Sequence, residues 1–225
     1  MTHWPFRDLP MFHYRCILAD PPWHFATWSR KGQGKSPSAH YPTMTHKEIL
    51  DLPVGDLARS GGPGFQDGCL LFLWATAPHL ELAMQCLKRW GFGYVTMGAW
   101  HKRTVHMKTA FGTGYVLRSA CEPFLIGRIG DPVYNDTTAA RSQRNLIDAR
   151  IGEHSAKPNQ QYEIMEALVG GPRVELFARC SPDGRIWSRD GWDGWGLEMQ
   201  SRLDAASEGQ VEVEAPQKPA NLPGI

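Results

Sequence analysis

The stretch that most constrains the fold is a continuous apolar run, GCLLFLWAT, at residues 68–76. A run of this kind, bounded by glycine and proline, is typical of a central strand that is buried on both faces of a sheet. The next segment, 78–92, has apolar residues at helical spacing, with Pro78 near its first turn and Gly91 at its end. A buried strand followed by an amphipathic helix favours an α/β fold.

Elements of both kinds alternate along the rest of the chain. Further strands are expected at 15–20, 94–102, 121–128 and 173–179, and further helices at 45–52, with Thr45 as N-cap, and at 159–169. This alternation predicts one α/β domain over residues 1–200, with a mostly parallel sheet and helices on both faces. Residues 201–225 lack aromatic side chains and are rich in Glu, Pro and Gln, so we expect a mobile tail there.

Three long segments have no apolar periodicity and are expected to be loops: 28–44, 103–119 and 129–156. Compact domains rarely carry such loops unless they serve a function. Ligands of open α/β sheets bind beyond the carboxyl ends of the strands. We therefore expect the loops to surround a binding site.

The composition excludes several classes of protein. Hydrophobic residues make up 42% of the 225-residue chain and the net charge is +1, so the chain is globular without an overall basic signature. No signal peptide or membrane-spanning run is present, which predicts a cytoplasmic protein. Cys16, Cys69 and Cys121 lie in apolar runs and are expected to be reduced core thiols, and no CxxC pair suggests a metal site.

The first strand ends abruptly in Asp20-Pro21-Pro22-Trp23, because two adjacent prolines continue neither a sheet nor a helix. The Asp20 carboxylate and the Pro21 carbonyl are consecutive acceptors, which suit a substrate amino group with its two donors. Trp23 could stack on a flat ring that bears this amine. For four residues alone the structural alternative is favoured, in which Asp20 caps a loop and Trp23 fills the core.

These four residues resemble the motif of SAM-dependent adenine-N6 methyltransferases of the MT-A70 type, which are similar to β-class DNA amino-methyltransferases. Other segments follow in the family's order over residues 15–200, including HYPTM (40–44), AWHK (99–102), GTGYVLRSACEPFLIGRIG (112–130), HSAKP (154–158) and VELFAR (174–179). The resemblance implies a Rossmann-like methyltransferase fold with a permuted order, in which the catalytic strand comes first and the cofactor-binding strand last.

The resemblance also implies a reaction. Asp20 and the Pro21 carbonyl would hold the N6 amine of adenine, Pro22 would fix the corner, and Trp23 and Tyr41 would stack on the base. Methyl transfer from SAM is a direct displacement, so placement of the amine matters more than a strong base. No metal is implied.

The SAM-binding residues that the resemblance implies are Asp20, His154, Ser155, Lys157, Phe177, Arg179, Ser181 and Glu198. The helix that HSAKP opens, at about residue 158, would turn its backbone donors and Lys157 toward the SAM carboxylate. Arg128, for which a solvated side chain is an equally favoured alternative, and Phe6 are further candidates. The sequence departs from the family at Leu197, where members often carry an asparagine that contacts the cofactor.

An adenine amine inside a duplex is reached only by extruding the base or by using a single strand. The candidates for nucleic-acid contacts are Arg30, Lys31, Lys35, Lys102, Arg103 and Arg118, with Arg141, Arg144 and Arg150 in the third loop; for about half of such residues a solvated surface is the alternative. A compact stand-alone domain looks bacterial or phage-encoded, which favours DNA over RNA. Specificity would come from these loops, a homodimer or a partner subunit. A catalytically silent nucleic-acid-binding subunit is the alternative from another class.

Overall fold

The computed structural model describes residues 4–23, 44–60, 67–114, 116–152, 156–179, 189–197, 199, 201 and 203–204. Its strands are β1 (Cys16–Ala19), β2 (Gly68–Trp74), β3 (Gly93–Arg103), β4 (Cys121–Gly130), β5 (Leu146–Arg150), β6 (Arg173–Leu176) and β7 (Trp192–Trp195). Its α-helices are α1 (His46–Asp51), α2 (Leu80–Arg89), α3 (Thr138–Arg141) and α4 (Gln160–Leu168).

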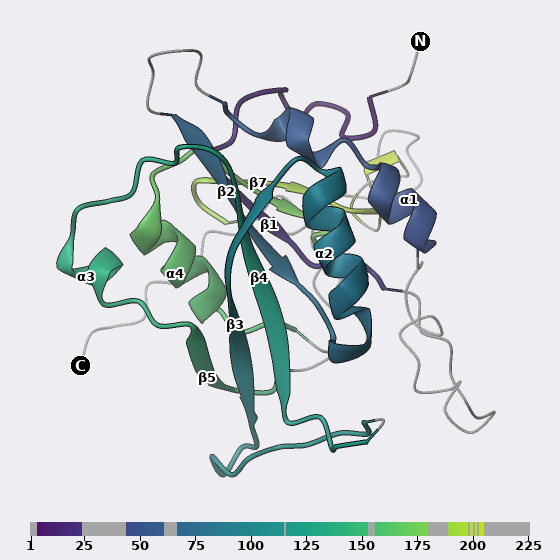
Figure 1. Cartoon of the computed structure of the whole chain (residues 1–225), viewed down its shortest axis with the longest axis vertical. Helices are drawn as coiled ribbons and strands as arrows, with labels where there is room; N and C mark the ends of the chain where they lie inside the picture. Colours follow the sequence, from purple (N-terminus) through teal and green to yellow (C-terminus); the bar gives the residue numbers. More distant parts are fainter. Residues whose placement is uncertain are drawn as a thin grey trace.

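The strands form one sheet in the order β5-β3-β4-β2-β1-β6-β7 (Figure 1). β1 lies between β2 and β6 and is parallel to both, and β7 is parallel to β6. β4 is antiparallel to β2 and β3, whereas β5 is parallel to β3. Every strand except β4 therefore points the same way. The predicted α/β class, the mostly parallel sheet and the central position of the strand in the run 68–76 are confirmed.

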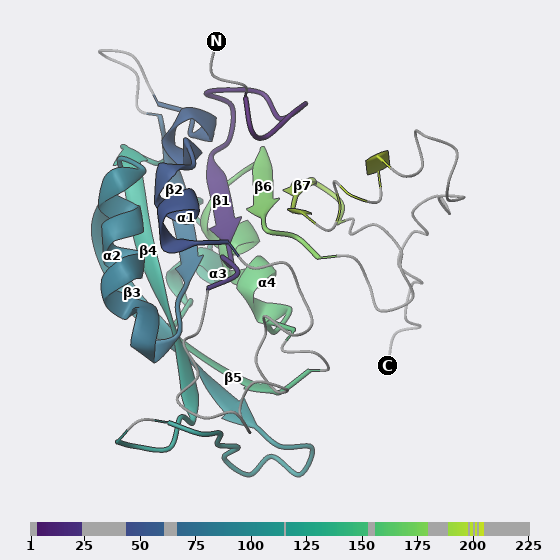
Figure 2. The ribbon, with the colours of Figure 1, turned by 90° about the vertical axis from the view of Figure 1, so that its right-hand side faces the viewer.

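Helices cover both faces of this sheet (Figure 2). Alternate side chains of each strand point to opposite faces, and they divide the core into two clusters. Ile17 and Leu71 pack in the cluster that includes α1 and α2, whereas Leu18 and Phe72 pack in the cluster that includes Tyr162 and Met165 of α4. Because the central strands are buried on both sides, they must be apolar at successive positions, as the run at 68–76 is.

Local signals place the helix ends. Thr45 caps α1 through the Glu48 N–H, and the Glu48 carboxylate accepts the Thr45 N–H in return, which is a complete capping box. At the carboxyl end of α2, Gly91 has a φ of 84°, a conformation that suits glycine. It follows the C-cap residue Trp90 and ends the helix. Both assignments made from the sequence are confirmed.

Several expectations were wrong in detail. The segment 129–156 contains α3 and the edge strand β5, and β7 was not predicted. All three elements are short, and β5 exposes every second side chain, so none of them has the apolar run of a central strand. The helix α4 begins at Gln160 rather than at 158. Cys16 and Cys69 are buried free thiols, but the predicted burial of Cys121 is wrong: it is the first residue of β4, at the end of the strand, and it is exposed.

The described residues reach Asp204, which forms a bidentate ion pair with Arg7 at 2.6 and 2.7 Å. The boundary expected at residue 200 and the mobile tail beyond it stay predictions. In the described part of the chain, no helix has both the length and the apolar character needed to cross a membrane.

Candidate active site

The candidate site lies at the carboxyl ends of β1 and β6, which are neighbours in the sheet. The chain goes from β1 to β2 on one side and from β6 to β7 on the other. Neighbouring strands whose connections leave in opposite directions form the crevice in which open α/β sheets bind ligands. Asp20 follows β1 directly and Phe177 follows β6 directly, so both residues lie at this crevice.

The corner after Asp20 is a hydrogen-bonded turn. The Trp23 N–H donates to the Pro21 carbonyl at 2.8 Å, which closes a three-residue turn centred on Pro22. The proline ring fixes φ near the value that an inverse γ-turn requires. The two prolines therefore end β1 and hold Asp20 at a fixed angle. From the described residues the Pro21 carbonyl accepts this one bond, and a carbonyl oxygen has two lone pairs.

Lys157 connects Asp20 to a second carboxylate. Its Nζ lies 2.8 Å from Asp20 Oδ2 and 3.0 Å from Glu122 Oε1, and its side chain is almost fully buried. Lys157 was predicted from the sequence as a ligand of the SAM carboxylate. The structure brings it instead against the catalytic candidate Asp20, and its contact with cofactor stays a prediction.

Glu122 is the site residue that the sequence interpretation missed. It comes second in β4, and its other carboxylate oxygen lies 2.7 Å from Lys102 Nζ. Lys102 and Lys157 also lie over the rings of Trp100 and Trp74, at 5.1 and 5.4 Å from the ring centres. The available signal was the single acid in the apolar run CEPFLI, since an acid in a buried strand is rarely tolerated without a partner.

The opposite charges in this cluster stabilise one another's ionised forms. Burial by itself would raise the pKa of Glu122, but Lys157 and Lys102 outweigh it and hold that pKa below its ordinary value. Burial would likewise lower the pKa of Lys157, but Asp20 and Glu122 outweigh it and raise that pKa. Glu122 and Lys157 therefore stay charged at neutral pH, although both lie in the protein interior.

A third acid, Glu175, lies beneath the site in β6, beside Leu18 of β1. Its carboxylate accepts a hydrogen bond from the Tyr162 hydroxyl at 2.7 Å. Burial raises the pKa of Glu175 to about 7, and the hydrogen bond from Tyr162 only partly opposes this. Glu175 therefore titrates near neutral pH.

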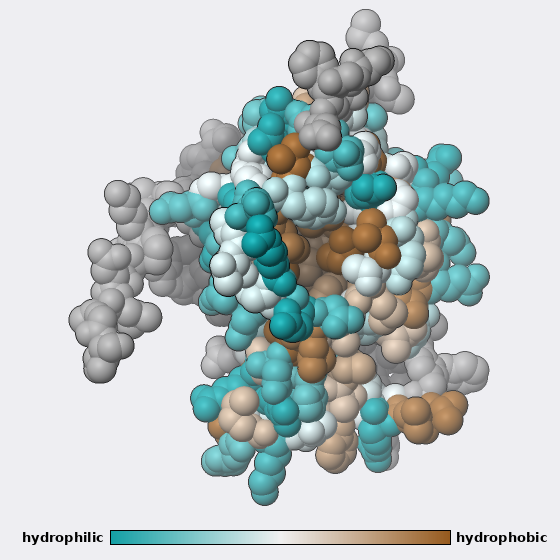
Figure 3. Space-filling model, turned by 60° about the vertical axis from the view of Figure 1, so that its left-hand side comes forward, coloured by the Kyte–Doolittle hydropathy of each residue, from teal (hydrophilic) through white to brown (hydrophobic). Residues whose placement is uncertain are grey.

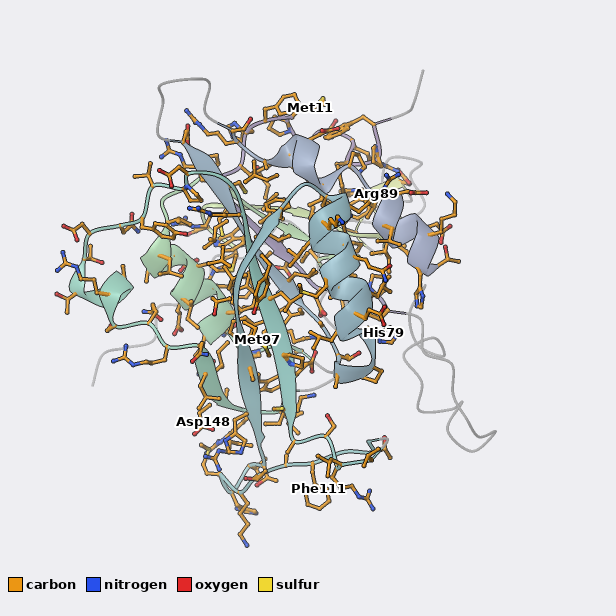
Figure 4. The ribbon with its side chains drawn as sticks, in the orientation of Figure 1. Met11, His79, Arg89, Met97, Phe111 and Asp148 are labelled. Atoms are coloured by element: carbon orange, nitrogen blue, oxygen red, sulfur yellow. The ribbon has the colours of Figure 1, made fainter. Side chains whose placement is uncertain are left out.

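Trp23 is buried, with 4% of its surface exposed, and its ring stacks on His79 at 5.7 Å between ring centres. Figure 4 shows His79 at the lower end of α2, and its Nδ1 lies 2.8 Å from Thr76 Oγ1. The Trp23 indole N–H has no hydrogen-bond partner among the described residues. One face of the ring is thus occupied by His79, and stacking of Trp23 on a substrate base stays a prediction.

On the cofactor side, Arg179 Nη2 lies 3.7 Å from Asp20 Oδ2. Phe177 has a φ of 65°, a costly conformation for a bulky residue, and its ring packs on Trp195 at 5.6 Å. Phe6 is buried and also packs on Trp195, with ring centres 5.0 Å apart, and Leu197 is exposed. His154, Ser155, Ser181 and Glu198 lie outside the described residues.

The basic residues predicted to contact nucleic acid differ in their surroundings. Lys102 pairs with Glu122, and Arg103 forms a bidentate ion pair with Asp148 at 2.5 and 2.9 Å. Arg118 is exposed in the segment between β3 and β4. The remaining substrate-contact candidates, Arg30, Lys31, Lys35 and Tyr41, lie outside the described residues.

The prediction that Arg128 contacts the cofactor is wrong. It pairs across the sheet with Leu70 and Gly93, near the amino ends of β2 and β3, so it lies at the opposite edge from Asp20. The reason is that β4 runs against the other strands, which carries Arg128 away from the site and brings Glu122 into it. Arg141 and Arg144 precede β5 and also lie on its amino-terminal side.

The sequence pattern that defines the MT-A70 family matches residues 14–198. The chain is 29% identical over 230 residues to the type II methyltransferase M.MunI of a Mycoplasma species, with 92% of this chain and 87% of the relative covered. It is 33% identical over 174 residues to a putative N(6)-adenosine-methyltransferase MT-A70-like protein of Medicago truncatula, covering 76% of this chain and 25% of the relative.

The human N(6)-adenosine-methyltransferase catalytic subunit METTL3 is 29% identical over 170 residues, covering 74% of this chain and 26% of METTL3. The chain therefore spans most of the length of M.MunI but about a quarter of the plant and human relatives. The matched region contains the described site residues from Asp20 to Leu197, and Phe6 lies before it. The chain belongs to the MT-A70 family of methyltransferases.

Proposed function

We propose that this protein transfers a methyl group from SAM to the N6 amine of adenine in nucleic acid, and that DNA is the preferred substrate. The observation that carries the proposal is the buried corner itself, where Asp20 is fixed by the Pro21–Trp23 turn and held by Lys157. A carboxylate that is held at a strand end in a ligand-binding crevice is poised to accept hydrogen bonds from an amine.

The crevice between β1 and β6 fits SAM, whose methionine end carries one ammonium and one carboxylate group. At this crevice the Asp20 carboxylate and the Arg179 guanidinium lie 3.7 Å apart, and their charges are opposite to those of the SAM ammonium and carboxylate. Asp20, Arg179 and Phe177 are the described residues that would hold the cofactor. When bound, the sulfonium supplies an electrophilic methyl group. Leu197 brings an apolar side chain where the family often has an amide, so the cofactor loses one hydrogen bond there.

The residues of the corner act by placement. Asp20 accepts a hydrogen bond from the adenine amine and aligns it, since an exocyclic amine is a poor nucleophile until its lone pair is directed at the methyl group. Lys157 holds the Asp20 carboxylate through the 2.8 Å ion pair, and Glu122 holds Lys157. Low exposure of the cluster excludes water, which strengthens each of these interactions.

The relatives support DNA more strongly than RNA as the substrate. The relative that is matched along most of its own length is named as a type II methyltransferase, whereas the N(6)-adenosine-methyltransferases are matched over about a quarter of theirs. Loops around the site, a second copy or a partner subunit supply the remaining contacts, and sequence specificity is relaxed.

The test is to incubate the purified protein with isotope-labelled SAM and with DNA or RNA, each single- and double-stranded, and to analyse the nucleosides by mass spectrometry. We expect labelled N6-methyladenine from DNA at a higher yield than from RNA. A higher yield from RNA would reverse the substrate preference. If calorimetry shows SAM binding but no substrate is methylated, the protein is a silent nucleic-acid-binding subunit and the proposed activity is wrong.

A further inference from the structure

The segment between β3 and β4, residues 104–120, is called the arm here. It leaves the sheet at Arg103, extends beyond the end of the molecule away from the helices, and returns at Cys121 (Figures 1 and 2). Its residues are described except for 115. From the sequence, this segment is expected to be a loop beside the binding site, with Arg118 as a candidate for nucleic-acid contact and no role for its apolar residues.

Backbone hydrogen bonds give the arm a defined shape. The Ala110 N–H donates to the Lys102 carbonyl and the Gly112 N–H donates to the Ser119 carbonyl, each at 2.8 Å. At the far turn, a Cβ on Gly114 would lie 1.8 Å from the Leu117 carbonyl oxygen, which only glycine permits. The chain therefore folds tightly at Gly114, and Val116 and Leu117 are called the tip of the arm.

The tip presents apolar side chains to solvent. Val116 is 96% exposed and Leu117 is 82% exposed, and Phe111 further back along the arm is 68% exposed. Figure 4 shows Phe111 on the arm with its ring pointing away from the sheet, and Figure 3 shows hydrophobic atoms at this end of the molecule beside strongly hydrophilic ones. Apolar groups at such a projecting turn contribute nothing to the core, so they point to a ligand.

The charge of the arm selects the kind of ligand. Residues 104–120 contain no Asp or Glu, and Arg118 directly follows the tip. Within the described part of the chain, neither Arg118 nor Lys108 forms an ion pair, in contrast to Lys102 and Arg103 at the root of the arm. An apolar tip flanked by unpaired cations complements a polyanion with a stacked apolar interior, which is the chemistry of a nucleic-acid duplex.

The arm is joined directly to the candidate active site. Its first flank ends in Lys102 and its second continues into Glu122, and these two residues form the ion pair that supports Lys157 and Asp20. A duplex that delivers an adenine to Asp20 therefore passes the arm. Only four residues, 118–121, lie between Leu117 and Glu122 in the chain.

We propose that Val116 and Leu117 form an apolar wedge that enters the base stack of a duplex and stabilises it while the target adenine is extruded toward Asp20. This inference rests on the proposed function, because extrusion is needed only if the adenine of a duplex is the substrate. Arg118 and Lys108 contact the phosphates on either side of the inserted tip.

The test compares a double variant, Val116→Ser with Leu117→Ser, with the unaltered protein on native and heat-denatured genomic DNA. We expect the variant to lose at least tenfold in methylation rate on native DNA and to stay within twofold on denatured DNA, where no base needs to be extruded. The matched control is Val105→Ser, an exposed apolar residue of the same arm away from the tip, which should leave both rates unchanged.

Other outcomes overturn the wedge. Equal losses of the double variant on native and denatured DNA, or no loss on either, would contradict it, as would an unaltered protein that methylates only denatured DNA. If sedimentation shows that the unaltered chain is dimeric and the double variant is monomeric, the tip binds a second copy instead. Absence of methylation by the unaltered protein on every substrate would instead remove the proposed function on which the wedge rests.

Discussion

The stretch from Lys102 to Glu122 buries charged side chains at its two ends and exposes apolar side chains in its middle. Its end residues, Lys102 and Glu122, form a largely buried ion pair that continues through Lys157 to Asp20. Its middle, the arm, exposes Val116 and Leu117 to solvent. In most of the molecule the reverse holds, with apolar strands inside and paired charges outside.

Neither arrangement is one that stability alone would select. Buried ion pairs seldom stabilise more than apolar residues of similar volume would, and exposed apolar side chains at a turn stabilise nothing. Residues that depart from the rules of folding in this way are expected at functional sites. The two regions nevertheless differ in one respect that can be measured: removing a charge from the cluster should cost stability, whereas removing the apolar tip should not.

The largest effect is expected from Lys157→Met. The substitution keeps the volume of the side chain but leaves the carboxylates of Asp20 and Glu122 close together without the cation between them. We expect the free energy of unfolding to fall by about 3–5 kcal/mol, the usual cost of removing one partner from a buried ion pair. Urea denaturation followed by circular dichroism measures it.

The control is a double variant, Lys157→Met with Glu122→Gln, which removes one of the two carboxylate charges as well. It should recover part of the lost stability, since the repulsion is gone. A Lys157→Met protein that is as stable as the unaltered chain would show that the cluster does not carry buried charge.

A smaller, pH-dependent effect is expected from Glu175→Gln. The pKa of Glu175 is raised to about 7 in the folded protein, so the native state binds this proton more tightly than the unfolded chain does. Stability is therefore greatest below the ordinary pKa of Glu and falls as the pH rises through about 7. Glutamine cannot ionise and can still accept the Tyr162 hydrogen bond.

The measurement is the difference in unfolding free energy between Glu175→Gln and the unaltered protein at pH 5 and at pH 8. The variant should gain about 1–3 kcal/mol relative to the unaltered protein over this interval, since one pKa unit corresponds to about 1.4 kcal/mol. A difference that is constant with pH would mean that Glu175 does not titrate there.

The smallest effect is expected from the arm. Val116→Ser with Leu117→Ser removes apolar surface that is already in water, so the free energy of unfolding should change by less than about 0.5 kcal/mol. Thermal melting of the double variant beside Lys157→Met compares the two regions directly. Destabilisation of the arm variant by more than about 1 kcal/mol would mean that the tip packs against the protein.

The sequence predicts the parts of the fold that depend on local patterns. The apolar run of β2, the Thr45 cap of α1 and the prolines after Asp20 each have a local cause, and each was correctly placed. β5 and β7 are short strands at the two edges of the sheet, and they form because β3 and β6 offer unpaired backbone, which no local pattern records.

The site was predictable only in part, for the same reason. Asp20 stands at a strand end that the sequence marks clearly. Its partner Lys157 lies 137 residues away, and no spacing in the chain relates the two. Glu122 enters the site only because β4 runs antiparallel, and the same reversal removes Arg128 from it. Contacts of this kind follow from topology.

The most direct test of the account is methyl transfer by Asp20→Ala, measured as labelled N6-methyladenine from DNA and compared with the control Asp51→Ala. Asp51 is an exposed acid on α1 whose ion pairs lie far from the crevice. We expect Asp20→Ala to lose transfer by at least about 100-fold and to keep its fold, because Lys157 retains Glu122 as a partner, while Asp51→Ala transfers normally. Turnover by a folded Asp20→Ala protein within twofold of the unaltered chain would show that Asp20 does not hold the amine.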